Sequence, residues 1–150
     1  MNNFRKATIQ YGIYTTVALI LFFFIVKMFG LVHNYNLRFL NIVVIGLGVY
    51  ICLKNFLKNH YEEFDYLRGL GIGFTVSLIT ALSFASFVLV YLLLNQEFVT
   101  EIKRIELQGD YLNEFSVSLL IFTETLIIGS LITFASMQWL KQKTINSKSK

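Results

Sequence analysis

The sequence predicts an all-helical integral membrane protein with four transmembrane helices in an antiparallel up-down bundle. Three observations indicate this fold class. Apolar residues make up 55% of the 150-residue chain and charged residues only 15%, whereas a soluble domain carries about a quarter charged residues. Four apolar segments approach or exceed the length of about 20 residues that a helix needs to cross a bilayer. No proline occurs in the chain, so we expect these helices to be unbroken.

The expected spans follow one another in a single domain, 1–150. The first contains YGIYTTVALILFFFIVKMF, and the fourth contains IFTETLIIGS. We expect spans at 8–29, 39–56, 70–94 and 115–140, with a loop at 95–114 and a frayed tail at 141–150. The first span follows Arg5 and Lys6, but its apolar run is too long for a signal peptide, so we expect it to be retained.

The distribution of positive charge predicts that both termini are cytoplasmic. Nine of the thirteen Lys and Arg residues flank the spans on the side of the termini. Only Lys27, Arg38, Lys103 and Arg104 lie on the other side. Because Lys and Arg are enriched in short cytoplasmic loops, the loop at 95–114 is expected to be external. Its apolar spacing fits either a surface amphipathic helix or a continuation of the third helix that ends at Gly109.

The third span carries a small residue at every fourth position. This small-residue stripe consists of Gly69, Gly73, Ser77, Ala81 and Ala85. Helices in lipid associate through close approach at small side chains and through hydrogen bonds, because the lipid is as apolar as the helix surface. We interpret the stripe as a packing surface inside the bundle, with a dimer interface as the alternative. Each of the other spans also has a side rich in small or polar residues, as a compact bundle requires.

Glu124 is the one acidic residue within the expected spans. It lies about 5 Å to the external side of the middle of its span. An ionised carboxylate at that depth costs about 3 kcal/mol, and keeping it protonated at neutral pH costs about 4 kcal/mol. The sequence therefore leaves its charge open.

On a helical wheel Glu124 lies about 130° from the small-polar side of its own helix. Candidate polar contacts are Asn41, Lys27, Ser83 and Ser86. Intramembrane carboxylates often relay protons, bind ions or contact other proteins. The alternative is a structural carboxyl group that is held by a hydrogen bond.

Other chemistry is scarce in the sequence. His60, Glu62, Glu63 and Asp65 match no metal-ligand spacing. The glycines at 69, 71 and 73 lack the preceding strand and the lysine of a phosphate-binding loop. Cys52 is the only cysteine, so no intramolecular disulfide forms. We expect no catalytic residue, no metal site, no cofactor and no nucleic-acid partner, and therefore not an enzyme.

Three stretches resemble a family of small bacterial four-span membrane proteins that is defined as a domain of unknown function. They are KATIQYGIYTTVALILFF, then FDYLRGLGIGFTVSLITALSFASFVLVYLL followed by NQEF, and finally IIGSLITFASMQWLK. The chain departs from the family at Gln96, where a proline usually stands. The resemblance implies a multi-pass protein of the bacterial inner (plasma) membrane. It implies no activity, ligand or catalytic residue.

From these observations we expect a non-enzymatic accessory or scaffold subunit that associates through its helices. The alternative is a small proton- or ion-coupled transporter that works as a homo-oligomer around Glu124. The expected partners are the lipid bilayer and either further copies of the chain or a larger membrane complex.

Overall fold

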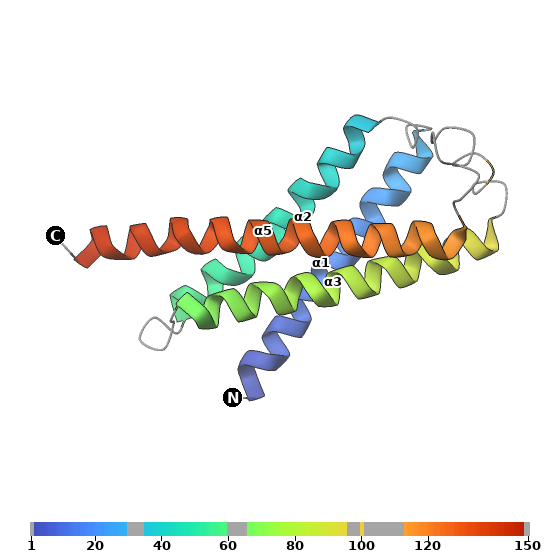
Figure 1. Cartoon of the computed structure of the whole chain (residues 1–150). Coiled ribbons are helices and arrows are strands. Elements are labelled where there is room, and N and C mark those ends of the chain that lie inside the picture. The colour runs from blue at the N-terminus through green and yellow to red at the C-terminus, as the bar shows by residue number, and fades with distance from the viewer. Residues whose placement is uncertain (1, 30–34, 60–65, 96–99, 101–112, 149–150) are drawn as a thin grey trace.

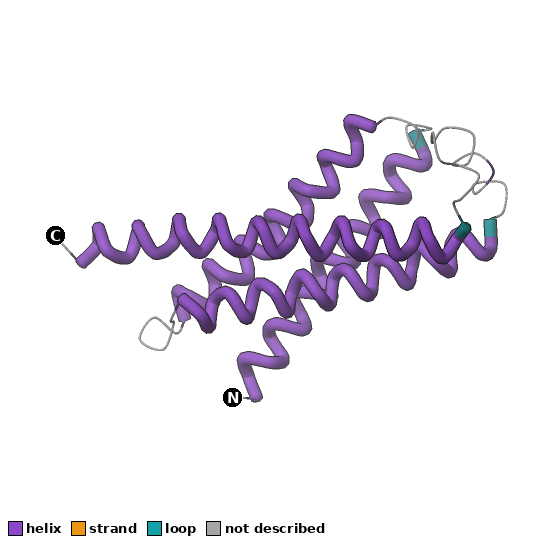
Figure 2. The backbone as a smooth tube through the Cα atoms, viewed as in Figure 1, coloured by secondary structure: helices purple, strands orange, loops and turns teal. Residues whose placement is uncertain are grey.

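The computed structural model describes residues 2–29, 35–59, 66–95, 100 and 113–148, and these residues are almost entirely helical, without strands (Figure 2). The helices are α1 (Asn2–Met28), α2 (Tyr35–Asn59), α3 (Tyr66–Leu94) and α5 (Glu114–Lys148). Each is long and apolar enough to cross a membrane. The predicted class, an all-helical protein with four candidate spans, is therefore confirmed within the described residues.

Helix α5 is longer than the sequence predicts, and the end of helix α3 bears on the predictions for the loop that follows it. Helix α5 continues to Lys148, whereas the sequence predicts a frayed tail from Lys141. Residues 141–148 contain neither Gly nor Pro, and Lys and Gln favour helix, so nothing in the sequence stops α5 at the end of its apolar part. Helix α3 ends at Leu94. Both predictions for the loop that follows fall largely on 96–99 and 101–112, which lie outside the described residues.

Two helical hairpins make up the fold. Helices α1 and α2 run in opposite directions, as do α3 and α5, and the first hairpin crosses the second (Figure 1). The most extensive packing joins α3 to α5, while α1 packs on α2 and α3, and α2 packs on α5. The order around the bundle is therefore α1, α2, α5, α3. This order puts α3 and α5 side by side and places α1 diagonally opposite α5.

Apolar residues fill the centre of the bundle and also cover its outside. Fully or almost fully buried side chains include Leu19, Ile45, Val49, Leu53, Val76 and Leu92. Large apolar side chains from all the described helices are exposed as well, among them Ile13, Leu47, Val90 and Leu131. Such a surface suits lipid, because the hydrocarbon core of a bilayer is as apolar as these side chains.

Apart from Tyr91, whose hydroxyl is also buried, the buried polar side chains in the described part of the chain are those of Thr and Ser. These residues are Thr8, Thr15, Thr16, Ser77, Thr80, Ser118, Thr125, Thr133 and Ser136. The hydroxyls of Thr16, Ser77 and Thr133 each donate to the backbone carbonyl four residues earlier, at 2.7–2.9 Å. A helix in lipid satisfies a buried hydroxyl in this way without a partner from another helix.

Candidate functional site

Helices α3 and α5 approach each other closely through glycine. A Cβ atom added to Gly73 would lie under 3.0 Å from Thr133, and one added to Gly129 would lie equally close to Ser77. Each helix thus presents a glycine to a hydroxyl residue of the other. The hydroxyl of Ser118 on α5 also donates to the carbonyl of Ala85 on α3, at 2.7 Å.

The small-residue stripe lies inside the bundle. All five of its members, Gly69, Gly73, Ser77, Ala81 and Ala85, are buried. Two of them, Gly73 and Ser77, make the close contacts with α5 described above. The stripe is therefore part of the packing within one chain.

Helix α1 uses the same kind of contact with its two neighbours. A Cβ atom on Gly12 would lie 2.8 Å from Cγ2 of Ile79 on α3, and one on Gly48 of α2 would collide with Thr15. The hydroxyl of Thr80 on α3 donates to the carbonyl of Gly12 at 3.3 Å. These contacts leave no room for even one added methyl group, so α1 packs tightly on both α2 and α3.

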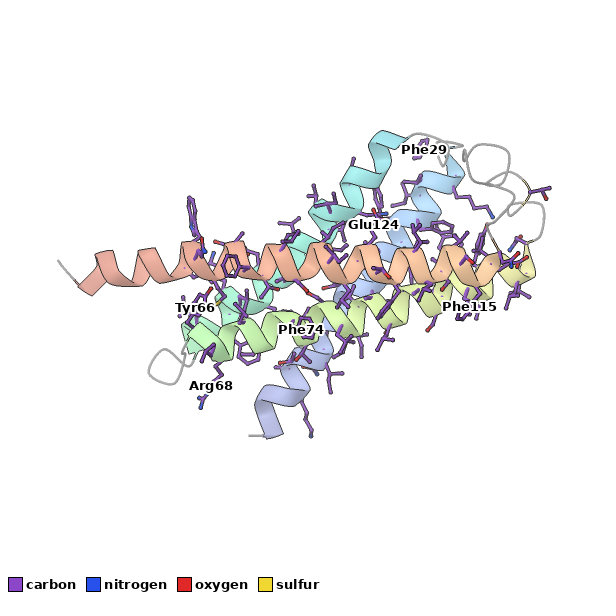
Figure 3. The ribbon with its side chains drawn as sticks, in the orientation of Figure 1. Phe29, Tyr66, Arg68, Phe74, Phe115 and Glu124 are labelled. Carbon is purple, nitrogen blue, oxygen red and sulfur yellow. The ribbon has the colours of Figure 1, made fainter. Side chains whose placement is uncertain are left out.

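Glu124 is half-buried on α5, away from the side that contacts α3 (Figure 3). Its neighbours on the helical wheel differ from one another in exposure. Leu120 and Leu131 are 45% and 64% exposed, whereas Val117 and Ile128 are partly buried. The carboxyl group therefore lies at the border between the packed and the exposed surface of the bundle.

The candidate polar residues near Glu124 come from three other helices and differ in exposure. Asn41 is half-buried on α2, the helix that packs beside α5. Ser83 and Ser86 are exposed on α3. They point away from the bundle, since Ala81 and Ala85 form the buried side of that helix.

Lys27 lies in an aromatic cluster formed by α1 and α3. Its Nζ is 4.9 Å from the centroid of the Tyr91 ring, a distance at which a cation is attracted to the face of the ring. Phe23 and Phe87 surround Tyr91, with ring centroids 5.1 and 6.3 Å from it. Sequence analysis missed this cluster. Its signal is the spacing of Phe23 to Lys27 and of Phe87 to Tyr91, which places each pair on one side of its helix.

A second unpredicted contact joins α1 and α2 near the end of the bundle where the chain begins. Nδ2 of Asn55 donates a hydrogen bond to the phenolic oxygen of Tyr11. Both residues belong to polar sides visible in the sequence, but their pairing depends on how the two helices are aligned. The signal available is that Tyr11 and Asn55 lie at similar depths in two successive antiparallel spans.

Potential metal ligands are sparse among the described residues. No three His, Cys, Asp or Glu residues among them lie close enough to hold a metal ion, and His60, Glu62, Glu63 and Asp65 lie outside the described residues. Within the described bundle, what stands out chemically is a carboxyl group at the border of the lipid-facing surface.

Four long apolar helices around a tightly packed, hydroxyl-containing centre, with apolar side chains outside, define a multi-pass membrane protein. The chain belongs to the family described as "Protein of unknown function (DUF4199)", whose model matches residues 10–142. This match confirms the resemblance inferred from the three sequence stretches. No curated protein and no solved structure is detectably similar to the chain.

Proposed function

We propose that the chain is a non-enzymatic accessory or scaffold subunit of a complex in the bacterial plasma membrane, with both termini in the cytoplasm. The observation that carries the proposal is the place of Glu124, half-buried at the border of the lipid-facing surface of α5. A subunit that docks onto another membrane protein needs a specific group on its outer surface, and Glu124 is a group of that kind.

The packing of the centre supports docking over transport through a single chain. A transport path through the monomer would pass through the centre of the bundle, where glycine contacts bring Gly73 against Thr133 and Gly12 against Ile79. The hydroxyls there donate to backbone carbonyls, as Thr16 and Thr133 do. These hydroxyls are already used in hydrogen bonds within their own helices.

The surroundings of Glu124 fit a contact with a partner helix. Leu120 and Leu131, which are exposed, lie one to two turns from it on the same side of α5. A helix packed over these leucines would also contact the carboxyl group.

The second candidate function is proton- or ion-coupled transport by a homo-oligomer. The same border position of Glu124 favours it, because a path between two subunits would run along the surface on which the carboxyl group lies. The two functions therefore share a residue and differ in what covers it, a different protein or a second copy of the chain.

Site-specific photocrosslinking tests the proposal. A crosslinking amino acid is placed at Leu131 on α5 and, as a matched control, at Ile13 on α1, because both positions are exposed. For an accessory subunit we expect one discrete product with a different protein from Leu131, weakened by Glu124→Gln, and none from Ile13. Equal products from both positions would contradict the proposal.

Flux measurements separate the two functions. Purified protein is reconstituted in vesicles, and pH-dependent solute flux is compared between the native chain and Glu124→Gln. We expect no flux that depends on Glu124. Flux that the substitution abolishes, together with crosslinking between two copies from Leu131, would replace the accessory role with transport. Thr123→Ala is the control, because the exposed Thr123 hydroxyl donates only to the carbonyl of Leu119 in its own helix.

A further inference from the structure

The α1–α2 interface opens to the surface through a polar cluster near the end of the bundle where α1 begins. We define the α1–α2 polar cluster as Tyr11, Tyr14, Lys54, Asn55 and Lys58. Asn55 donates to the Tyr11 oxygen across the interface. The ring of Tyr14 lies edge-on to that of Tyr11, with centroids 6.5 Å apart, and 66% of Tyr14 is exposed.

The two lysines lie on the outward side of this interface. On a helical wheel Lys54 and Lys58 lie about 100° and about 60° to the same side of Asn55. Both are exposed, while Cys52 and Phe56 on the other side of Asn55 are buried. The lysines therefore flank the Asn55–Tyr11 hydrogen bond on the surface that faces away from the core.

Helix α1 shows the same division around Tyr11. Tyr14 lies about 60° to one side of Tyr11 and is exposed, whereas Thr8 and Thr15 on the other side are buried. Because the core lies on one side of the interface for both helices, the exposed members of the cluster share the other side.

The cluster offers donors and positive charge to an anion. Neither α1 nor α2 contains an acidic residue, so these helices supply no carboxylate to neutralise the lysines. The Tyr11 oxygen accepts the hydrogen bond from Asn55, and its own O–H can donate to a further acceptor. Two ammonium groups and a phenol match a group with several acceptor oxygens and a negative charge, such as phosphate.

Apolar side chains continue the same surface toward the middle of the bundle. Ile51 and Leu47 of α2 are 51% and 55% exposed, and Leu21 of α1 is 59% exposed. On the wheel these residues lie on the same side of Asn55 and Tyr11 as the lysines and Tyr14. An anionic group at one end and an apolar surface beyond it match a phospholipid better than a free anion.

We propose that the α1–α2 polar cluster binds the phosphate of an anionic phospholipid, whose acyl chain lies along Ile51 and Leu47. The lysines supply the charge that favours an anionic headgroup over a zwitterionic one. Tyr11, held in place by Asn55, donates to a phosphate oxygen. This binding does not depend on Glu124, which lies on a different helix.

Native mass spectrometry of the full chain tests this proposal. The purified protein in detergent is titrated with phosphatidylglycerol, with phosphatidylcholine and with inorganic phosphate. The variants are Lys54→Gln/Lys58→Gln and Tyr11→Phe. The charge-matched control is Lys143→Gln/Lys148→Gln, because this pair lies beyond the candidate span at the end of α5. Circular dichroism checks that each variant remains helical.

We expect phosphatidylglycerol to bind at least tenfold more tightly than phosphatidylcholine. The double lysine variant is expected to lose about tenfold in this affinity and Tyr11→Phe about fivefold, while the control matches the native chain. If the lysine variant misfolds, Tyr11→Phe still tests the site, because this substitution removes a single oxygen atom and leaves the aromatic ring in place. Equal loss in the control, or no loss in either variant, would overturn the site. Binding of inorganic phosphate without preference for phosphatidylglycerol would assign the cluster to a free anion and overturn the lipid proposal.

Discussion

Each of the two hairpins packs two antiparallel helices against each other, but the α3–α5 interface differs from the α1–α2 interface. Between α3 and α5 the glycine contacts are reciprocal, Gly73 against Thr133 and Gly129 against Ser77, and Ser118 adds a hydrogen bond to the other helix. Between α1 and α2 the close contact is Gly48 against Thr15, and the hydrogen bond that joins them, Asn55 to Tyr11, is exposed. The named contacts of the first interface are buried, whereas the second also includes an exposed polar pair.

This difference indicates a division of roles. Helix–helix contacts in lipid depend on close approach and hydrogen bonds, and the α3–α5 interface combines both in buried positions. The α1–α2 interface leaves donors and lysines on its outer side, where a ligand from the membrane can reach them. We therefore expect substitutions in the α3–α5 interface to affect stability most.

The largest effect is expected for Gly73→Ala. Its Cβ atom would lie under 3.0 Å from Thr133, so helices α3 and α5 must move apart, which we expect to cost about 2 kcal/mol. Gly71 is the matched control, two residues away in the same helix, because a Cβ there has no atom within 4 Å. Gly71→Ala is expected to be neutral or to stabilise by up to about 1 kcal/mol, since alanine favours helix. Thermal unfolding in detergent, followed by circular dichroism, measures both. Equal effects of the two substitutions would contradict close packing at Gly73.

A smaller loss, about 1 kcal/mol, is expected for Gly48→Ala in the α1–α2 interface. The added methyl group would collide with the hydroxyl and methyl groups of Thr15. Thr15→Ala removes those atoms, so the double variant is expected to be more stable than the sum of the two single changes predicts. A double-mutant cycle of unfolding midpoints measures this coupling. Strict additivity would mean that the two residues are not in contact.

Removal of the Ser118 hydroxyl is expected to cost somewhat less than 1 kcal/mol, as interhelical hydrogen bonds in membranes average about 0.6 kcal/mol. The Ser118→Ala variant loses the 2.7 Å bond to the carbonyl of Ala85. The comparison is Thr123→Ala, because that hydroxyl donates within α5 alone. We expect unfolding of the first variant to begin at a lower detergent-denaturant concentration than unfolding of the second. The reverse order would show that the α3–α5 interface does not depend on this bond.

The smallest effect, about 0.5 kcal/mol, is expected for Lys27→Met. The substitution keeps a long apolar side chain but removes the cation that lies 4.9 Å from the centre of the Tyr91 ring. Lys27→Arg keeps the charge and should restore stability, since guanidinium groups also pack on aromatic faces. Unfolding midpoints of the three chains give the comparison. If Lys27→Arg is as unstable as Lys27→Met, the cation does not contribute through the ring.

Much of the fold could be predicted because it depends on local composition. Helices of 25 to 35 residues form where apolar runs occur without proline, since a chain in lipid must satisfy its backbone hydrogen bonds within each segment. The C-terminal extension of α5 differs from expectation because helix propensity, rather than the length of the apolar run, decides where a helix ends in water.

The candidate site could be predicted only in part. Glu124 stands out in the sequence as a carboxyl group in an apolar run, and the wheel separates it from the small-polar side of α5. Its relation to Ser83 and Ser86 could not be inferred, because depth along a span does not determine direction around it. Those serines are exposed on α3, on a side of that helix that does not pack on α5.

By itself the sequence determined that this protein crosses a membrane with helices and that glycine and hydroxyl residues bring those helices together, because both properties follow from the chemistry of single segments. Only the tertiary structure decided which segments meet. It set Gly73 against Thr133 and Gly48 against Thr15, placed Lys27 over Tyr91, and joined Tyr11 to Asn55. The physical reason is that every helix carries similar small and apolar residues, so the choice of neighbour depends on shape matching between whole helices and not on any one residue.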